Sequence, residues 1–186
     1  MPRLHPFSWL PPERLAAIWW TMFAVTVVTL AALLQVGAPL RNDKAPRGVI
    51  SLQLAGDLSQ AREIVESWGE EGRVRAGFNL GLDYLFLATY GPFLALSCAL
   101  VTLKMPRQTR RLVSVGFLLA WLQLLAALLD AVENYALIRF LLGSEKSLWP
   151  AIAVTCAVPK FALVSLGILY SLVGFLLIQI RGFVRA

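Results

Sequence analysis

Two carboxylates and an amide lie close together in the stretch Asp-Ala-Val-Glu-Asn at residues 130–134. If this stretch is helical, Asp130, Glu133 and Asn134 share one face, because offsets of three and four residues return to the same side. Such a face suits a general base or an oxygen-coordinated cation such as Mg²⁺ or Ca²⁺. The only histidine, His5, lies in the N-terminal tail, and no catalytic triad, HExxH or phosphate-loop motif accompanies the acids. The sequence therefore predicts no catalytic residues, no metal ligands and no cofactor.

Further polar residues interrupt other apolar stretches. Asn79, Asp83 and Tyr90 are spaced by four and seven residues, which places them on one side of a helix. Gln123 lies two helical turns before the acidic stretch, and Lys160 lies within the last apolar stretch. Together, the candidate ligand-binding or ion-binding residues are Asn79, Asp83, Tyr90, Gln123, Asp130, Glu133, Asn134 and Lys160.

The charges among these residues are expected to pair, because an ionisable side chain in hydrocarbon costs at least ~2.5–3.5 kcal/mol. We expect Lys160 to neutralise Asp83 or Asp130. Asn79 and Asn134 would then satisfy the remaining carboxylate oxygens. Such a cluster would serve as a structural network or as a site for a cation, a proton or a lipid headgroup. Its acidic excess favours a cation or a proton over an anionic substrate.

The polar residues also share a predicted depth. A length of ~20 helical residues crosses the hydrocarbon, and counting that length from the basic end of each apolar stretch reaches Gln35, Asp83, Asp130 and Lys160. The layer marks either the membrane boundary or a meeting point inside a helix bundle. The second interpretation is favoured because Gly167 and Gly174 lie on the same side as Lys160, and small residues let helices approach closely.

Four long apolar stretches must position these side chains. The chain has 186 residues, of which 58% are hydrophobic and 15% charged, with a mean hydropathy of +0.69. Soluble domains carry about 25% charged residues, so the composition indicates an all-α integral membrane protein. We predict a single four-helix transmembrane domain over residues 1–186, with an outer loop over 37–78. The predicted spans cover about 15–36, 82–103, 112–132 and 158–180.

The basic residues predict the orientation of these spans. Arg3 and Arg14 precede the first span, Lys104–Arg111 joins the second to the third, and Arg181 and Arg185 follow the fourth. These flanks fall on one side of a four-span bundle, which by the positive-inside rule places both termini in the cytoplasm of a multi-pass protein of the plasma (inner) membrane. The same rule accounts for the net charge of +6, so we expect no nucleic-acid partner.

The loop between the first two spans is predicted to contain a short amphipathic helix over 57–68. Asp57 or Ser59 would cap its start, and Gly69 would end it. Ile64, Val65 and Trp68 give the helix one apolar side. The helix would lie on the outer leaflet or across the mouth of the bundle, or it would be a surface helix that shields the backbone of the loop.

Three function classes remain open at this stage. The first is a non-catalytic membrane protein, either an accessory or assembly subunit or a binding protein for a lipid or small ligand. The second is an ion or proton channel or transporter subunit that uses Asp83, Asp130, Glu133 and Lys160. The third is a membrane enzyme that acts on lipid with Asp130 or Glu133 as base. The expected partners are membrane lipid and either further copies of this chain or a larger membrane complex.

Overall fold

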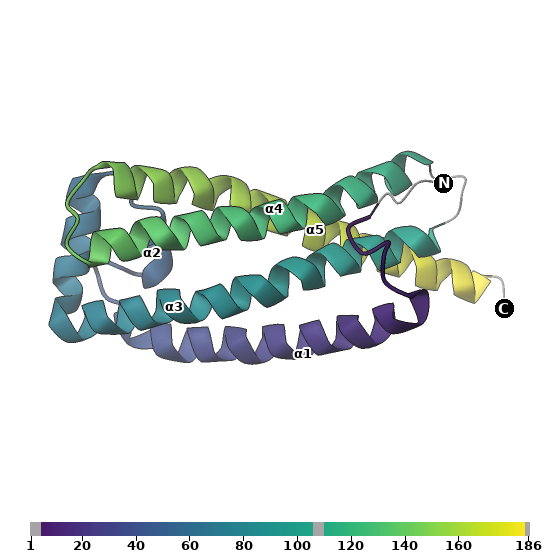
Figure 1. Ribbon diagram of the computed structural model, residues 1–186, viewed down its shortest axis with the longest axis horizontal. Coiled ribbons are helices and arrows are strands. Elements are labelled where there is room, and N and C mark those ends of the chain that lie inside the picture. The colour runs from purple at the N-terminus through teal and green to yellow at the C-terminus, as the bar shows by residue number, and fades with distance from the viewer. Residues whose placement is uncertain (1–4, 106–109, 185–186) are drawn as a thin grey trace.

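The computed structural model describes residues 5–105 and 110–184, and the elements within these ranges are all helical (Figure 1). In chain order they are α1 (Pro12–Gly37), the 3₁₀ turn η1 (Ala38–Leu40), α2 (Val49–Gln53), α3 (Leu58–Lys104), α4 (Arg110–Leu141) and α5 (Leu148–Val184). Four segments in the described ranges are long and apolar enough to cross a membrane: Pro12–Leu40, Leu58–Lys104, Arg111–Leu141 and Leu148–Ile180. The predicted all-α four-helix bundle with a further short helix is confirmed.

The four long helices run side by side, and α1 begins at the same end of the bundle at which α5 finishes (Figure 1). We name this the termini end, and we name the opposite end, covered by the segment from 41 to 68, the capped end. Along the bundle, α1 packs against α3, whereas α5 packs against α4 and α3. Arg3, Arg107 and Arg185, which contribute to the predicted orientation, lie outside the described residues.

Close helix packing along α5 depends on glycine. A Cβ atom on Gly167 would collide with the side chain of Gln123 on α4, and one on Gly174 would collide with Val101 on α3. The side of α5 that carries these glycines therefore faces other helices, as their spacing predicted. Because glycine has no side chain, the side chains of Gln123 and Val101 lie directly against the backbone of α5, which lets the helices approach closely here.

The helices are longer than the apolar stretches that predicted them. As predicted, Asp57 caps a helix by accepting a hydrogen bond from the backbone N–H of Gln60 (2.9 Å). Also as predicted, that helix is broken at Gly69, whose φ of 61° is a conformation that favours glycine. Beyond Gly69, however, the helix resumes, so residues 70–78 are helical although a loop was predicted there. The reason is that a helix need not stop where the hydrocarbon does.

The first part of α3 lies across the mouth of the bundle. Ile64, Val65 and Trp68 are buried, which excludes the alternative in which their apolar side lies on the leaflet. Trp68 also donates an indole hydrogen bond to the carbonyl of Leu40 at 2.8 Å. The cluster that these side chains join includes Leu40, Ala45, Val49, Leu52, Ala55, Ala61, Ala76, Leu80, Leu137, Phe140, Leu141 and Ala153. The cap is therefore part of the hydrophobic core.

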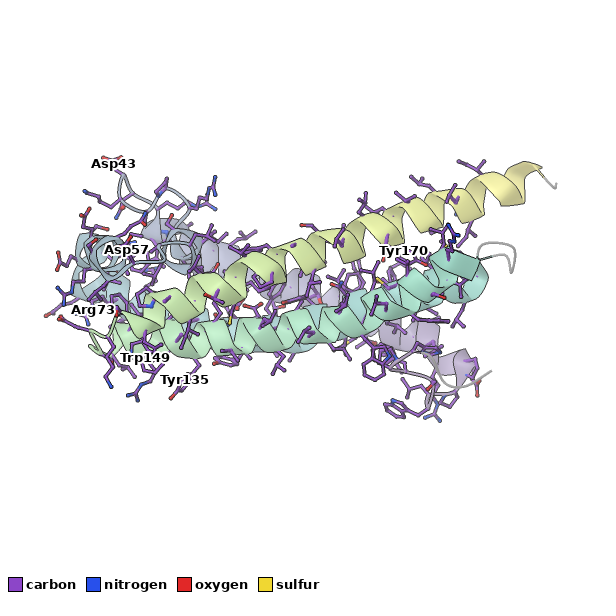
Figure 2. All side chains as sticks on the ribbon, turned by 90° about the horizontal axis from the view of Figure 1, so that it is seen from above. Asp43, Asp57, Arg73, Tyr135, Trp149 and Tyr170 are labelled. Atoms are coloured by element: carbon purple, nitrogen blue, oxygen red, sulfur yellow. The ribbon has the colours of Figure 1, made fainter. Side chains whose placement is uncertain are left out.

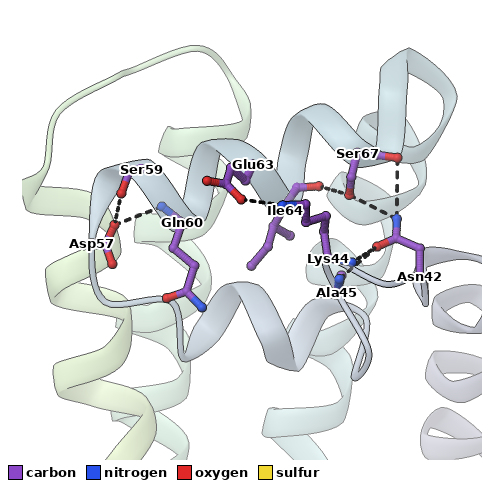
Figure 3. A network of polar contacts seen from close by, with 9 residues as sticks. All are labelled: Asn42, Lys44, Ala45, Asp57, Ser59, Gln60, Glu63, Ile64 and Ser67. Atoms are coloured by element: carbon purple, nitrogen blue, oxygen red, sulfur yellow. Dashed lines mark hydrogen bonds and ion pairs between the residues drawn. The ribbon is translucent and has the colours of Figure 1, made fainter.

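Residues 41–48 join η1 to α2, and we name them the connecting segment. Polar contacts hold this segment against the first part of α3 (Figure 3). Asn42 donates to the hydroxyl of Ser67 at 3.0 Å, and Lys44 forms an ion pair with Glu63 at 2.9 Å. Farther along α3, Arg73 donates to the carbonyl of Leu141 at the end of α4, at 2.8 Å. Asp43, Asp57 and Arg73 all lie at the capped end, whereas Tyr170 lies toward the termini end (Figure 2). Together with the shared apolar cluster, these contacts join α3, α4 and α5 at the capped end.

Candidate functional site

A lysine and two carboxylates meet inside the bundle. The Nζ atom of Lys160 on α5 lies 2.8 Å from Oδ1 of Asp130 and 2.7 Å from Oε2 of Glu133, both on α4. Lys160 and Asp130 are each only 4% exposed, and Glu133 is completely buried. Because all three side chains are turned away from the surface of the bundle, a simple membrane boundary does not account for them. They form a buried ion cluster with one more negative than positive charge.

Helix α3 adds two polar side chains to this cluster. The hydroxyl of Tyr90 donates to Oδ2 of Asp130 at 2.9 Å. Asp83 is half-buried, accepts a hydrogen bond from Nδ2 of Asn134 at 2.6 Å, and lies within electrostatic range of Asp130 and Lys160. Six of the eight candidate residues therefore come together: Asp83, Tyr90, Asp130, Glu133, Asn134 and Lys160.

The other two candidates bond to backbone carbonyls instead. Asn79 donates to the carbonyl of Leu33 at 2.9 Å and so fastens α3 to α1, although we expected it to satisfy a carboxylate. Gln123 is completely buried and donates to the carbonyl of Leu163 at 2.9 Å, which joins α4 to α5. Gln35, counted in the polar layer, is exposed on α1. Within the described residues, neither Asn79 nor Gln123 forms a hydrogen bond with the ion cluster; each joins two helices, and Asn79 also lines the pocket described below.

Three of the cluster's oxygen atoms have spare hydrogen-bonding capacity. Within the described residues, neither carboxylate oxygen of Glu133 meets hydrogen-bond geometry, and Oδ1 of Asn134 has no hydrogen-bond partner. The contact between Glu133 and Lys160 is therefore an ion pair alone. A buried polar atom without a partner costs about 1–3 kcal/mol, so the cluster is not a fully satisfied structural network.

One wall of a pocket is formed by this cluster. The pocket has a volume of about 430 Å³ and is neither sealed nor flat, and its size is in the range of small-molecule sites, roughly 300–1,000 Å³. Asp83, Tyr90, Asp130 and Lys160 contribute to its lining. Most of the remaining wall is apolar and comes from Leu30, Leu33, Leu34, Val49, Ile50, Leu80, Phe86, Phe93, Leu94, Phe161, Val164 and Ile168.

Sequence reasoning missed the residues that line the capped end of the pocket. These are Arg41 and Arg47 in the connecting segment and Gln53 in α2. The two arginines are exposed, and Gln53 is only 7% exposed. They belong to a part of the chain in which apolar residues have no regular spacing. No periodic pattern therefore indicated which of its polar side chains would line a pocket. In residues 5–105 and 110–184, no group of three metal-ligating side chains could hold a metal ion.

The length and hydropathy of its four spans define this chain as a polytopic membrane protein. No family model, curated protein or solved structure matches it.

Proposed function

We propose that this chain is a non-catalytic membrane protein that binds a lipid or another small amphipathic ligand in the pocket. The observation that carries the proposal is the pairing of an apolar pocket with a few convergent polar groups, which is the usual composition of a ligand site. The apolar wall suits a hydrocarbon chain. The polar side chains of its lining, at the ion cluster and at the capped end, suit recognition of a polar group.

The packing of the helices supports entry from the membrane. Leu33 and Leu34 on α1 line one side of the pocket, and Val164 and Ile168 on α5 line another. These two helices do not pack along one another, because α1 is attached to the bundle mainly through α3. A pocket whose opposite walls belong to unpacked neighbouring helices opens sideways. An amphipathic ligand would therefore enter from the bilayer without crossing water.

A blocked pocket tests the proposal. The purified full chain in detergent is titrated with dioleoyl phospholipids, and bound lipid is counted by native mass spectrometry. Val164→Trp fills the pocket, whereas Leu166→Trp places the same bulk on the exposed side of α5. We expect Val164→Trp to weaken binding by about tenfold or more and Leu166→Trp to leave it unchanged. Equal binding by both variants would reject the pocket as the site.

A second candidate function is proton-coupled or ion-coupled transport, and the buried cluster favours it. Two carboxylates share one lysine inside a membrane span, and such residues commonly mark ion pathways. Reconstituted vesicles would then show an ion or proton flux that falls on Asp130→Asn. If no flux appears under an imposed gradient of protons, sodium or potassium, this candidate fails.

We further propose that the termini end faces the cytoplasm of a plasma (inner) membrane. The basic residues Arg14, Lys104 and Arg111 lie at the ends of α1, α3 and α4 that adjoin the termini end, and such residues are retained on the cytoplasmic side. The test is labelling of intact cells with a membrane-impermeant maleimide. Ser59 at the capped end and Glu13 near the start of α1 are both exposed, so a difference in labelling would report the side of the membrane. Ser59→Cys should react and Glu13→Cys should not. The reverse pattern would overturn the orientation.

A further inference from the structure

Two cations at the capped end of the pocket have no acidic partner. Arg41 and Arg47 line the pocket, and neither side chain forms an ion pair with any described residue. Among the acids of the capped end, Glu63 pairs with Lys44 and Glu145 pairs with Arg62, whereas Asp43, two residues after Arg41, forms no ion pair with either arginine. Arginine presents several donors in a planar fork that matches phosphate. This end of the pocket therefore offers a place for an anionic group.

The acids of the pocket restrict where that anionic group lies. Asp83 and Asp130 line the pocket from the spans, and only Asp130 is paired with Lys160. An anion at their depth would meet like charge, so it is favoured only toward the arginines. The acidic excess of the cluster, which the sequence suggested would select a cation, acts here as a barrier that keeps an anion at the capped end.

A buried acceptor lies at the same end. Gln53 is 7% exposed and lines the pocket, and its Oε1 atom has no hydrogen-bond partner within the described residues. Because this atom is covered in the structure, the Gln53 side chain must rotate toward the pocket before a ligand donor can reach it, and a ligand that brings such a donor removes the cost of the unpaired acceptor. The binding partner should therefore carry an N–H or O–H group as well as an anion.

The apolar walls account for the rest of the ligand. Phe86 and Phe93 on α3 and Phe161 on α5 line the pocket farther from α2, together with the aliphatic side chains of α1. The hydrocarbon of a ligand would therefore lie along these apolar walls, and its anion and its donor would lie toward the capped end, where Arg41, Arg47 and Gln53 line the pocket. A phospholipid whose phosphate carries an amine or hydroxyl headgroup combines these three groups in one molecule.

We infer that the pocket binds a phospholipid with a hydrogen-bond donor in its headgroup. Its phosphate pairs with Arg41 and Arg47, its headgroup donates to Oε1 of Gln53, and its hydrocarbon lies between α1 and α5. This inference rests on the proposed function and specifies its ligand. Phosphatidylethanolamine fits because its ammonium group donates. Phosphatidylcholine carries the same phosphate but no donor, so it fits less well.

The matched pair of lipids gives a direct experiment. The full chain in detergent is titrated with phosphatidylethanolamine and with phosphatidylcholine of identical acyl chains, and the bound fraction is followed by native mass spectrometry. One hydrogen bond from a charged donor should make phosphatidylethanolamine bind roughly tenfold more tightly. Phosphatidylglycerol, whose hydroxyl groups also donate, should share this advantage. Equal affinity for the first two lipids would overturn the headgroup inference while leaving a lipid pocket intact.

Gln53→Leu tests the donor contact alone. The variant removes the acceptor and keeps a similar volume, so phosphatidylethanolamine should fall to the affinity of phosphatidylcholine. The ratio of the two affinities is the readout, and the thermal unfolding of the variant shows independently that it is folded. A parallel loss for both lipids would overturn the assigned role of Gln53.

The double variant Arg41→Gln/Arg47→Gln tests the phosphate contact. Both lipids should bind at least about tenfold more weakly, because both carry the phosphate. The control, Arg75→Gln/Lys146→Gln, removes the same charge from two positions that do not line the pocket: Arg75 is half-buried and paired with Glu71, and Lys146 is exposed. An equal loss in the control would replace the site with general electrostatic attraction. Displacement of lipid by inorganic phosphate would indicate a free-anion site instead.

These outcomes are distinct from failure of the proposed function. If Val164→Trp leaves the binding of every phospholipid unchanged, no lipid occupies the pocket and both proposals fall. If that variant blocks binding but the two headgroups are not distinguished, only the inference about the headgroup falls.

Discussion

Helix α5 faces two different surroundings within one bundle. Toward α3 and α4 it presents Gly167 and Gly174, where even one additional carbon would collide with a neighbour. Toward α1 it presents Val164 and Ile168, which border an open pocket of about 430 Å³. Lys160 lies near the boundary between the two and is held from the packed side. The comparison shows that a small bundle can combine a rigid seam with a binding space by assigning them to different faces of one helix.

The largest effect should follow from removing the cation of the cluster. Lys160→Met leaves Asp130 and Glu133 buried without a counter-charge, which should lower the free energy of unfolding by ~3–5 kcal/mol. Denaturant titration of the detergent-solubilised chain measures this loss. The triple variant Lys160→Met/Asp130→Asn/Glu133→Gln should regain most of the stability, because no unpaired charge remains. A small effect of Lys160→Met would mean that water reaches the cluster freely.

The capped core and the pocket wall should respond differently to truncation. Leu137 is completely buried in the cluster at the capped end, so Leu137→Ala should cost ~2–5 kcal/mol. Leu33→Ala removes the same atoms from a half-buried side chain that borders open space, so its cost should be clearly smaller. The same denaturant titration compares the two. Equal costs would show that the pocket is filled and packed like the core.

The packed seam should reject a single methyl group. Gly174→Ala should lower the free energy of unfolding by ~1–3 kcal/mol, because its Cβ collides with the branched side chain of Val101. Gly77→Ala is the matched control, since a Cβ there meets nothing within 4 Å. Alanine has the higher helix propensity, so this control should be stabilised by up to ~1 kcal/mol. In thermal unfolding, the melting temperature should therefore fall for the first variant and rise for the control. A change in the same direction for both would contradict the close contact.

The smallest effect concerns the first turn of α3. Hydrogen bonds from the backbone of Gln60 and the side chain of Ser59 lower the pKa of Asp57 below its ordinary value. The ionised carboxylate therefore stabilises the folded state above its ordinary pKa, and this stabilisation is lost as pH falls through the lowered pKa. The melting temperature of Asp57→Ala should be slightly below that of the natural chain at neutral pH. The difference between the two melting temperatures should disappear in strong acid. A difference that grows in acid would contradict this role of Asp57.

Much of the fold was predictable because it depends on local patterns. Apolar length identified the four spans, and Asp57 and Gly69 marked the ends of the helix in the connection by their cap and backbone chemistry. The depth of polar residues along each span also brought Asp130 and Lys160 to one level. These features need only the rise per residue and the hydrocarbon thickness.

The contacts that depend on helix rotation were less predictable. Glu133 became the second partner of Lys160, and Asn79 turned to the carbonyl of Leu33, because the phase of each helix is set by packing against its neighbours. Gln35 shares the predicted depth of the cluster, yet α1 turns it outward. Arg41 and Arg47 lie in an irregular segment, so their convergence on the pocket follows only from the tertiary structure.

Helix α1 begins at the end of the bundle at which α5 finishes, and this has a practical consequence. Helix α1 has 26 residues, and at about 1.5 Å per residue it spans ~39 Å. A tether attached close to the start of α1 is thus held about that far from the residues that follow α1, among them Arg41. Immobilised protein would keep its capped end free, so added molecules could be exchanged over it while the attachment stays undisturbed.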